Sequence, residues 1–228
     1  MNPLFIGTAE RRLFGIYEPA APSRGKPRAA VLCYPLGSEY IYAHRSMRQL
    51  AARLAAAGYH TLRFDYFGTG DSAGETQQAD LVGSNFDAAA AIEALKDIAG
   101  TAKVALIGLR AGANIAVNVA SRHGSEVDAL VLWDPIVSGE QYVESLQTPS
   151  GNEIGAHMLR DLRSIDLRSN LAGLPHRSMM LVTERSPSHE QLGIPVEFVS
   201  AACPWVESIT TSGALPVPAI QRIEEWLR

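Results

Sequence analysis

The sequence predicts a three-layer α/β protein, built on a mostly parallel sheet of about eight strands with helices on both faces. Short apolar runs of strand length alternate with helical stretches along most of the chain, which is typical of a parallel sheet. The first two apolar runs are separated only by the three residues 8–10, which indicates an antiparallel hairpin. Residues 136–176 contain helical pieces but no strand-like run, so this segment is predicted to be a lid inserted over the edge of the sheet.

The elements follow in order from their hydrophobic patterns. The first long helix is predicted because Met47, Leu50, Leu54 and Ala57 share one helical face and Gly58 supplies a stop. The predicted strands span residues 3–7, 11–20, 28–36, 60–68, 103–110, 128–135, 177–184 and 196–201. The predicted helices span residues 44–59, 86–100, 111–124, 186–193 and 218–228.

Composition limits the classes of function. The 228 residues are 46% hydrophobic with a formal net charge of −4, which favours one globular domain over residues 1–228 and excludes a disordered chain. No run of Lys and Arg is present, which argues against a nucleic-acid partner. The longest apolar stretches are strand-sized, so neither a signal peptide nor membrane insertion is expected, and the predicted location is the cytoplasm. No metal-binding motif and no dinucleotide fingerprint occurs, so no metal and no cofactor is expected.

The segment most indicative of function is Gly108-Leu109-Arg110-Ala111-Gly112. It joins a predicted buried strand directly to a helix, which is the setting of the G-x-S-x-G nucleophile elbow. Glycines flank such a turn because the backbone there approaches its neighbours closely. Here the central position holds Arg110 in place of a nucleophile, so the frame of the elbow is present without its reactive side chain.

Together with this elbow, three further segments indicate a family. They are YPLGSEY at 34–40, FDYFGTGDSAGE at 64–75 and a final helix ending EEWL. Over nearly its whole length, the chain resembles the α/β-hydrolase superfamily, specifically its serine aminopeptidase-like branch. A narrower similarity is to the hydrolase-like proteins associated with exosortase systems. The resemblance implies an esterase-like site, with the loop 34–40 supplying part of an oxyanion hole.

The sequence departs from the pattern of that family. The family orders its catalytic triad as Ser, then Asp or Glu, then His, with the His between the last strand and the last helix. In this chain the corresponding stretch, 201–216, contains no histidine. Asp134 and Glu184 each follow a strand and both suit the acid position. With two of three triad positions vacant, the standard acyl-enzyme mechanism is predicted to be absent.

Arg110 has two interpretations. It stands at a helix N-terminus, where backbone N–H groups and the helix dipole favour an anion, and its guanidinium adds a bidentate donor. This favours an anion-binding site with Arg110 and Asp134 at its catalytic positions. Alternatively, Arg110 pairs with Asp134 or Glu184 and closes an inactive site.

The ligand is expected to be a small anionic molecule with an apolar tail. Tyr34 and other residues at the carboxyl ends of the strands could supply its wall. The residues predicted to bind it are Leu36, Gly37, Ser38, Tyr40, Tyr66, Phe67, Leu109, Ala111 and Trp205.

Other reactive side chains have structural alternatives. Cys33 could be a second nucleophile, but small buried cysteines usually pack. His44 could act as a base, and Ser72 as a nucleophile, although each also suits a structural role. Three functions therefore remain open at the level of sequence. They are hydrolysis or acyl transfer on a small ester, thioester or amide without the triad, binding of an acidic ligand or a partner protein by a degenerate relative, and a non-hydrolytic reaction in which Arg110 holds a carboxylate or enolate.

Overall fold

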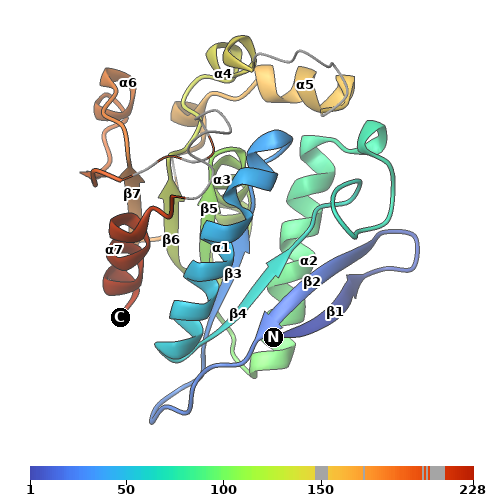
Figure 1. Cartoon of the computed structure of the whole chain (residues 1–228), viewed down its shortest axis with the longest axis vertical. Coiled ribbons are helices and arrows are strands. Elements are labelled where there is room, and N and C mark those ends of the chain that lie inside the picture. The colour runs from blue at the N-terminus through green and yellow to red at the C-terminus, as the bar shows by residue number, and fades with distance from the viewer. Residues whose placement is uncertain (147–153, 172, 202, 204, 206–213) are drawn as a thin grey trace.

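The computed structural model describes residues 1–146, 154–171, 173–201, 203, 205 and 214–228. Its centre is an eight-stranded sheet in the order β1-β2-β4-β3-β5-β6-β7-β8 (Figure 1). The strands are β1 (Asn2–Gly7), β2 (Arg12–Glu18), β3 (Arg28–Cys33), β4 (Tyr59–Phe64), β5 (Val104–Leu109), β6 (Val127–Trp133), β7 (Ser178–Val182) and β8 (Val196–Phe198).

The pairing of the strands confirms the predicted sheet. β1 and β2 form an antiparallel hairpin, and β2 also pairs antiparallel with β4. Every later pairing, from β4–β3 through to β7–β8, is parallel. The carboxyl ends of the parallel strands therefore meet along one edge, which is where such sheets place their ligands.

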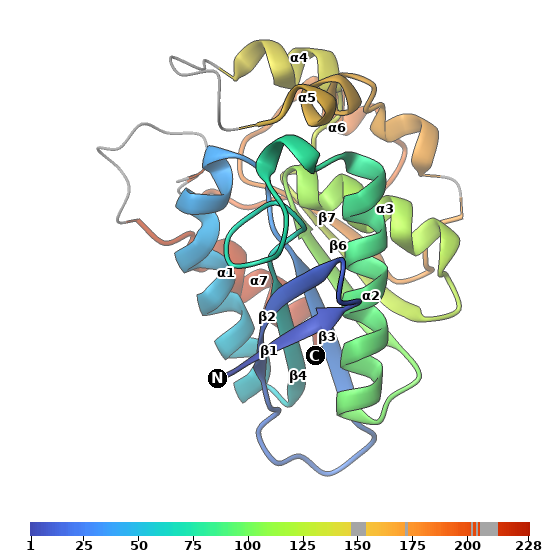
Figure 2. The same cartoon turned by 90° about the vertical axis from the view of Figure 1, so that its right-hand side faces the viewer.

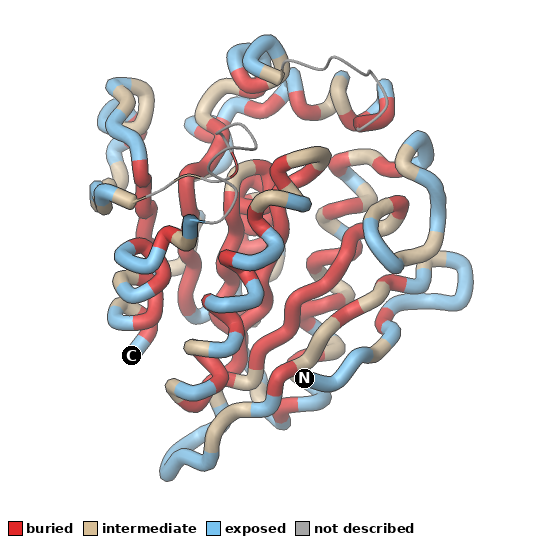
Figure 3. The backbone as a smooth tube through the Cα atoms, in the orientation of Figure 1, coloured by how far each residue is buried: buried red, intermediate tan, exposed pale blue. Residues whose placement is uncertain are grey.

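Helices cover both faces of the sheet. Figure 2 shows α1 and α7 on one side and α2 and α3 on the other. The central strands are consequently buried on both faces (Figure 3), and every residue of β5 is inaccessible. The helices are α1 (Ser38–Ala56), α2 (Leu81–Ala99), α3 (Ala111–Arg122), α4 (Gly139–Ser145), α5 (Ala156–Arg163), α6 (Pro187–Glu190) and α7 (Val217–Leu227), with short 3₁₀ turns η1 (Thr76–Gln78) and η2 (Leu167–Asn170).

Two helices begin earlier than the sequence predicts. α1 starts at Ser38, directly after Gly37 turns the chain at φ 60°, so His44 lies inside the helix and does not open it. α2 starts at Leu81, where the carboxylate of Asp80 accepts a hydrogen bond from Gly83 N. Both starts precede the apolar periodicity from which a helix is recognised, which is why the pattern misses them.

The described parts of the predicted lid, 136–146, 154–171 and 173–176, lie over the carboxyl ends of the strands, as Figures 1 and 2 show for α4 and α5, and we call them the lid. A β-bridge between Ser138 and Asp166 ties its two halves together. Gly139 contacts the second half so closely that a Cβ would lie 1.8 Å from Leu162 O. Among the described residues, no helix is long and apolar enough to cross a membrane.

We expect Gly112→Ala to destabilise the fold, because its Cβ would lie 2.3 Å from Cys33 O and 2.4 Å from Tyr34 O. Backbone atoms cannot move aside as a side-chain end can, so the loss in the free energy of unfolding should reach at least about 2 kcal/mol. Urea denaturation measures it. Gly124→Ala is the matched control, since its Cβ would meet only Ala120 O at 3.4 Å. Equal stability of the two variants would contradict the close approach of β3 and α3.

Candidate functional site

The turn between β5 and α3 has the geometry of a strained elbow. Arg110 adopts φ 54° and ψ −124° as the residue that caps α3. A Cβ on Gly108 would lie 2.3 Å from Gly112 O, and Gly112 itself packs against the backbone that follows β3. The two glycines flanking the elbow are therefore required by the packing, as the sequence predicted.

The strain is concentrated at this edge of the sheet. Among the described residues, Arg110 and Asp134 are the two non-glycine residues with positive φ, 54° and 42°. They lie at the ends of neighbouring strands, where Arg110 N donates to Trp133 O at 3.0 Å. Conformations of this kind persist only where the surrounding structure enforces them, and they gather at functional sites.

The Arg110 side chain forms a partly buried ion pair with Glu39, whose own side chain is buried. Arg110 Nε donates to Glu39 Oε1 at 3.0 Å, and Nη1 donates to the backbone oxygen of Asp134 at 3.3 Å. Arg110 therefore pairs with neither predicted carboxylate, because Glu39 lies closer, in the first turn of α1. Within the described residues, its Nη2 makes no hydrogen bond.

Glu39 links the elbow to the lid. Its Oε2 accepts a hydrogen bond from Tyr142 of α4 at 3.0 Å, and the guanidinium of Arg110 lies 5.3 Å from the centre of the Tyr142 ring. Burial raises the pKa of the Glu39 carboxyl, while the charge of Arg110 and its hydrogen bond oppose that rise. Neither Glu39 nor Tyr142 was predicted from the sequence as a site residue. The signal available for Glu39 was an acidic residue directly after the loop 34–38.

Both carboxylate oxygens of Asp134 accept hydrogen bonds from Thr183. Its Oδ1 accepts from Thr183 N and its Oδ2 from Thr183 Oγ1, both at 2.7 Å. Burial raises the pKa of this carboxyl, and the two hydrogen bonds oppose the rise. Glu184, the other candidate for the acid position, is exposed. Asp134 therefore occupies the interior position beside Arg110, with its oxygens already used to hold the end of β7.

Asn114 is a further residue that the sequence analysis missed. This buried side chain on α3 donates to Ile136 O at 2.8 Å and accepts from Ile136 N at 3.1 Å. The amide thereby replaces a backbone partner and fixes the segment that leads from β6 into α4. The lid is thus joined to the elbow region through Asn114 as well as through Tyr142.

A cavity of about 190 Å³ opens beside Arg110. His189 of α6 lines it opposite the residues that lead into α4. Nε2 of His189 lies 3.4 Å from Pro135 O, and Nδ1 is buried without a hydrogen bond among the described residues. The walls are otherwise formed by Pro135, Ile136, Val137, Ser138, Gln141, Tyr142, Ser145 and Ser188.

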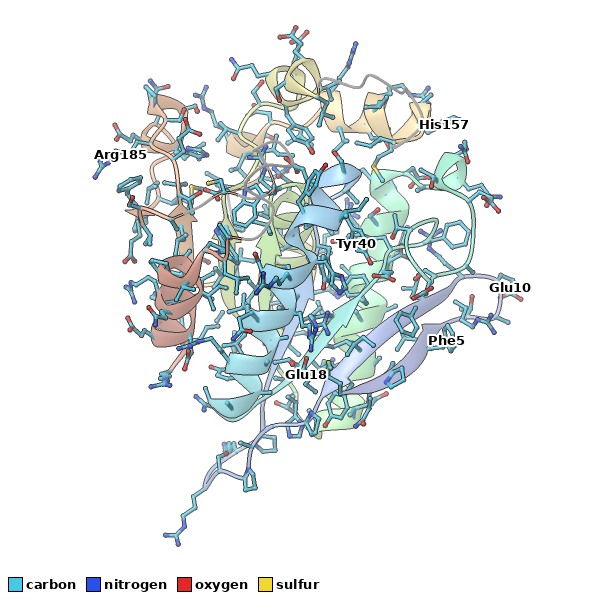
Figure 4. The ribbon with its side chains drawn as sticks, in the orientation of Figure 1. Phe5, Glu10, Glu18, Tyr40, His157 and Arg185 are labelled. Carbon is cyan, nitrogen blue, oxygen red and sulfur yellow. The ribbon has the colours of Figure 1, made fainter. Side chains whose placement is uncertain are left out.

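The predicted ligand-binding residues divide into two groups. Gly37, Ser38 and Tyr40 line a separate cavity of about 450 Å³ between the start of α1 and the loop 68–76. Tyr40, labelled in Figure 4, donates its hydroxyl to Asp65 at 2.7 Å. The remaining predicted ligand-binding residues are more buried than these three.

Leu36, Leu109 and Ala111 are buried, so their side chains are core and only their backbones are available to the site. Tyr34 and Tyr66 are also core residues, and Tyr66 donates to Tyr34 O at 3.2 Å. The predicted aromatic wall is therefore not supported, because these rings turn inward.

Phe67 is partly buried, and Trp205 packs inside the protein. Phe67 lies under the guanidinium of Arg11, 4.4 Å from the ring centre. Trp205 is buried and meets Trp133 edge to face, with the ring centres 5.1 Å apart. Most of the loop 201–215 lies outside the described residues.

The alternative reactive groups have structural roles. Ser72 donates to Asp65 O at 2.6 Å and accepts from Phe14 N at 2.8 Å, which fixes its loop against β2. His44 stacks on Tyr34 with ring centres 5.9 Å apart. Cys33 is fully buried, and burial raises the pKa of its thiol to about 12.

The elbow can therefore donate hydrogen bonds but carries no nucleophile of its own. The guanidinium of Arg110 lines the cavity, and Arg110 is also the residue that caps the N-terminus of α3. Its charge is balanced by Glu39, and Asp134 adds a second carboxylate nearby. An acceptor without a formal charge suits this balance better than an anion does.

Comparison with known proteins places this geometry in context. The model of the family described as serine aminopeptidase, S33, matches residues 25–176. No curated protein matches the chain.

Several solved structures resemble the chain along its whole length. An esterase of Pyrococcus furiosus shares 18% identity at a TM-score of 0.69, covering 99% of this chain and 89% of that chain. Est1E of Butyrivibrio proteoclasticus shares 11% identity at a TM-score of 0.71, covering 100% and 99% of the two chains. A putative α/β-hydrolase of Agrobacterium tumefaciens shares 17% identity at a TM-score of 0.68, covering 99% and 94%. At such low identities the similarity shows the fold.

We expect Glu39→Gln to destabilise the protein by about 2 kcal/mol, because it leaves the partly buried Arg110 cation without its counter-ion. The double variant with Arg110→Gln should be less destabilised than the sum of the two single variants. Urea denaturation of all three measures the coupling. Glu93→Gln is the control, since its pair with Lys96 is exposed and worth less than about 1 kcal/mol. Strict additivity of Glu39→Gln and Arg110→Gln would show that the pair is not formed.

We expect Cys33 to resist iodoacetamide in the native protein at pH 8. With a pKa of about 12, only about one thiol in 10⁴ is ionised at that pH, and the side chain is fully buried. Peptide mapping after labelling, with and without denaturant, measures the modification. Rapid labelling of Cys33 in the folded protein would restore it as a nucleophile.

Proposed function

Because the chain belongs to the serine aminopeptidase S33 family of α/β-hydrolases, we propose that it hydrolyses a small ester, thioester or amide without forming an acyl-enzyme. The observation that carries the proposal is the place of Arg110. A paired guanidinium stands where the family holds its nucleophile, and it lines a cavity beside the N-terminus of α3. Such a residue stabilises a developing oxyanion but cannot itself be acylated.

The charge of the site selects among the three functions left open by the sequence. Glu39 neutralises Arg110, and the carboxylate of Asp134 lies close behind it. A free carboxylate or an enolate would be repelled by the excess negative charge of Glu39 and Asp134, whereas a neutral carbonyl would not be repelled. A carbonyl group accepts a hydrogen bond from Arg110 Nη2 without requiring the Glu39 pair to break, which favours hydrolysis over the binding of an acidic ligand.

The proposed reaction uses water directly. The carbonyl oxygen accepts from Arg110 and from the backbone N–H of Ala111, so that the negative charge formed on it by water attack is stabilised. His189 lines the same cavity, and neither of its ring nitrogens makes a hydrogen bond shorter than 3.4 Å among the described residues. His189 accepts the proton of the attacking water and returns it to the leaving alcohol, thiol or amine as the acyl bond breaks.

We expect Arg110→Gln to lower kcat/KM for the best neutral ester by about 10²-fold, the effect of removing one oxyanion donor. Arg110→Lys keeps the charge and the Glu39 partner, so it should retain more activity than Arg110→Gln. Steady-state hydrolysis of a panel of esters, thioesters and amides measures both. Arg110→Ser should not become an efficient esterase, because residues 201–216 hold no histidine. Unchanged hydrolysis by Arg110→Gln would remove the proposed role.

We expect His189→Gln to lower kcat by about 10²-fold or more, with little change in the affinity for an unreactive amide analogue. The control is His157→Gln, since His157 lies on the exposed face of α5, labelled in Figure 4. Full activity of His189→Gln would assign the base elsewhere. If the esters, thioesters and amides of the panel bound but none was hydrolysed, ligand binding would replace hydrolysis as the function.

A further inference from the structure

The cavity beside Arg110 continues under the lid. A second cavity, of about 310 Å³, shares four of its lining residues, so the two adjoin. We call the two together the lid trough. Its inner end is at Arg110, and its outer end is at Arg168 of η2. The shared wall consists of Val137, Ser138, Gln141 and Ser188.

The shared wall is mainly polar. Ser138 Oγ accepts a long hydrogen bond from Gln141 N at 3.4 Å, and Ser188 Oγ contacts Ser186 Oγ at 2.7 Å. The side-chain amide of Gln141 makes no hydrogen bond among the described residues. Hydroxyl and amide groups with free hydrogen-bonding capacity suit a polar connecting segment better than an acyl tail.

Arg168 differs from Arg110 in its charge balance. Its guanidinium is held by a neutral group, the side-chain oxygen of Gln191 at 3.2 Å. Within the described part of the chain, no carboxylate lies within 4.0 Å of it. Asp166 lines the same cavity, and its Oδ1 accepts from the backbone N of Arg168 at 3.1 Å, as the cap of η2. Arg168 is exposed and makes no ion pair within the described part of the chain, although the negative charge of Asp166 lies in the same cavity.

We infer that the lid trough binds a two-ended substrate, whose neutral carbonyl lies at Arg110 and whose far end is an anionic carboxylate or phosphate at Arg168. The inference rests on the proposed function for the place of the carbonyl. The sequence predicted an anionic group at Arg110. The inference places that group at Arg168 instead, which has no carboxylate partner among the described residues. The polar wall between the two ends receives the segment that joins them.

Binding of unreactive amides tests this directly. The probes are N-acetyl aminoalkyl compounds of matched lengths that end in a carboxylate, a phosphate or a neutral amide, with affinity measured by calorimetry. The anionic probes should bind about 10-fold more tightly than the neutral one, as expected for one charge-assisted contact. Arg168→Gln should reduce this ratio to about one, and Arg168→Lys should preserve most of it. The carboxylate and phosphate arms show which anion is preferred.

Arg163→Gln is the matched control, because Arg163 is an exposed arginine of the same lid that does not line the trough. It should keep the preference of the wild type. Equal affinity for charged and neutral probes, no binding of any probe, or a preference that survives Arg168→Gln would overturn the inference. Ester hydrolysis without a preference for anionic leaving groups would leave the proposed function standing alone. A preference for anionic probes that depends on Arg168, without hydrolysis of any ester, would support the anion site and overturn the proposed hydrolysis.

Discussion

The ion pair between Arg110 and Glu39 is the interaction on which the site depends. Arg110 stands at the strained elbow between β5 and α3, and Glu39 lies in the first turn of α1. An unpaired carboxylate would cost several kcal/mol at the buried position of Glu39, whereas the side chain of Arg110 is 19% exposed. Glu39 therefore requires Arg110, and Tyr142 extends the link from Glu39 to the lid. One charge pair thus joins the sheet, the first helix and the segment that covers them.

This pair also determines which chemistry the fold retains. The elbow has its two glycines and its positive φ, and in the proposed reaction it donates hydrogen bonds to a carbonyl oxygen. Its central residue, Arg110, is not a nucleophile, and Asp134 is bound to the backbone and hydroxyl of Thr183. In the proposed reaction Glu39 balances the charge of Arg110, and Arg110 donates hydrogen bonds to a neutral acceptor. The inferred anionic end of the substrate lies farther out, at Arg168.

The parts of the structure that depend on local pattern could be predicted from the sequence. The strands, the opening hairpin and the glycine frame of the elbow follow from hydrophobic period and from steric need. The partner of Arg110 could not be predicted, since Glu39 is 71 positions away and Tyr142 lies on a lid helix. Two rings of the predicted aromatic wall, Tyr34 and Tyr66, are buried in the core for a related reason, whereas Tyr40 lines a cavity. A position after a strand fixes where Tyr66 lies, but packing alone decides that its ring turns into the core.

The central claim is that the elbow acts without being acylated, and intact-protein mass spectrometry tests it most directly. The protein would be mixed with a fluorophosphonate, and separately with a large excess of the ester that it hydrolyses fastest, then quenched during turnover. The account predicts the unmodified mass of the chain in both samples while product accumulates. A stoichiometric phosphonyl adduct, or a protein heavier by one acyl group, would contradict it.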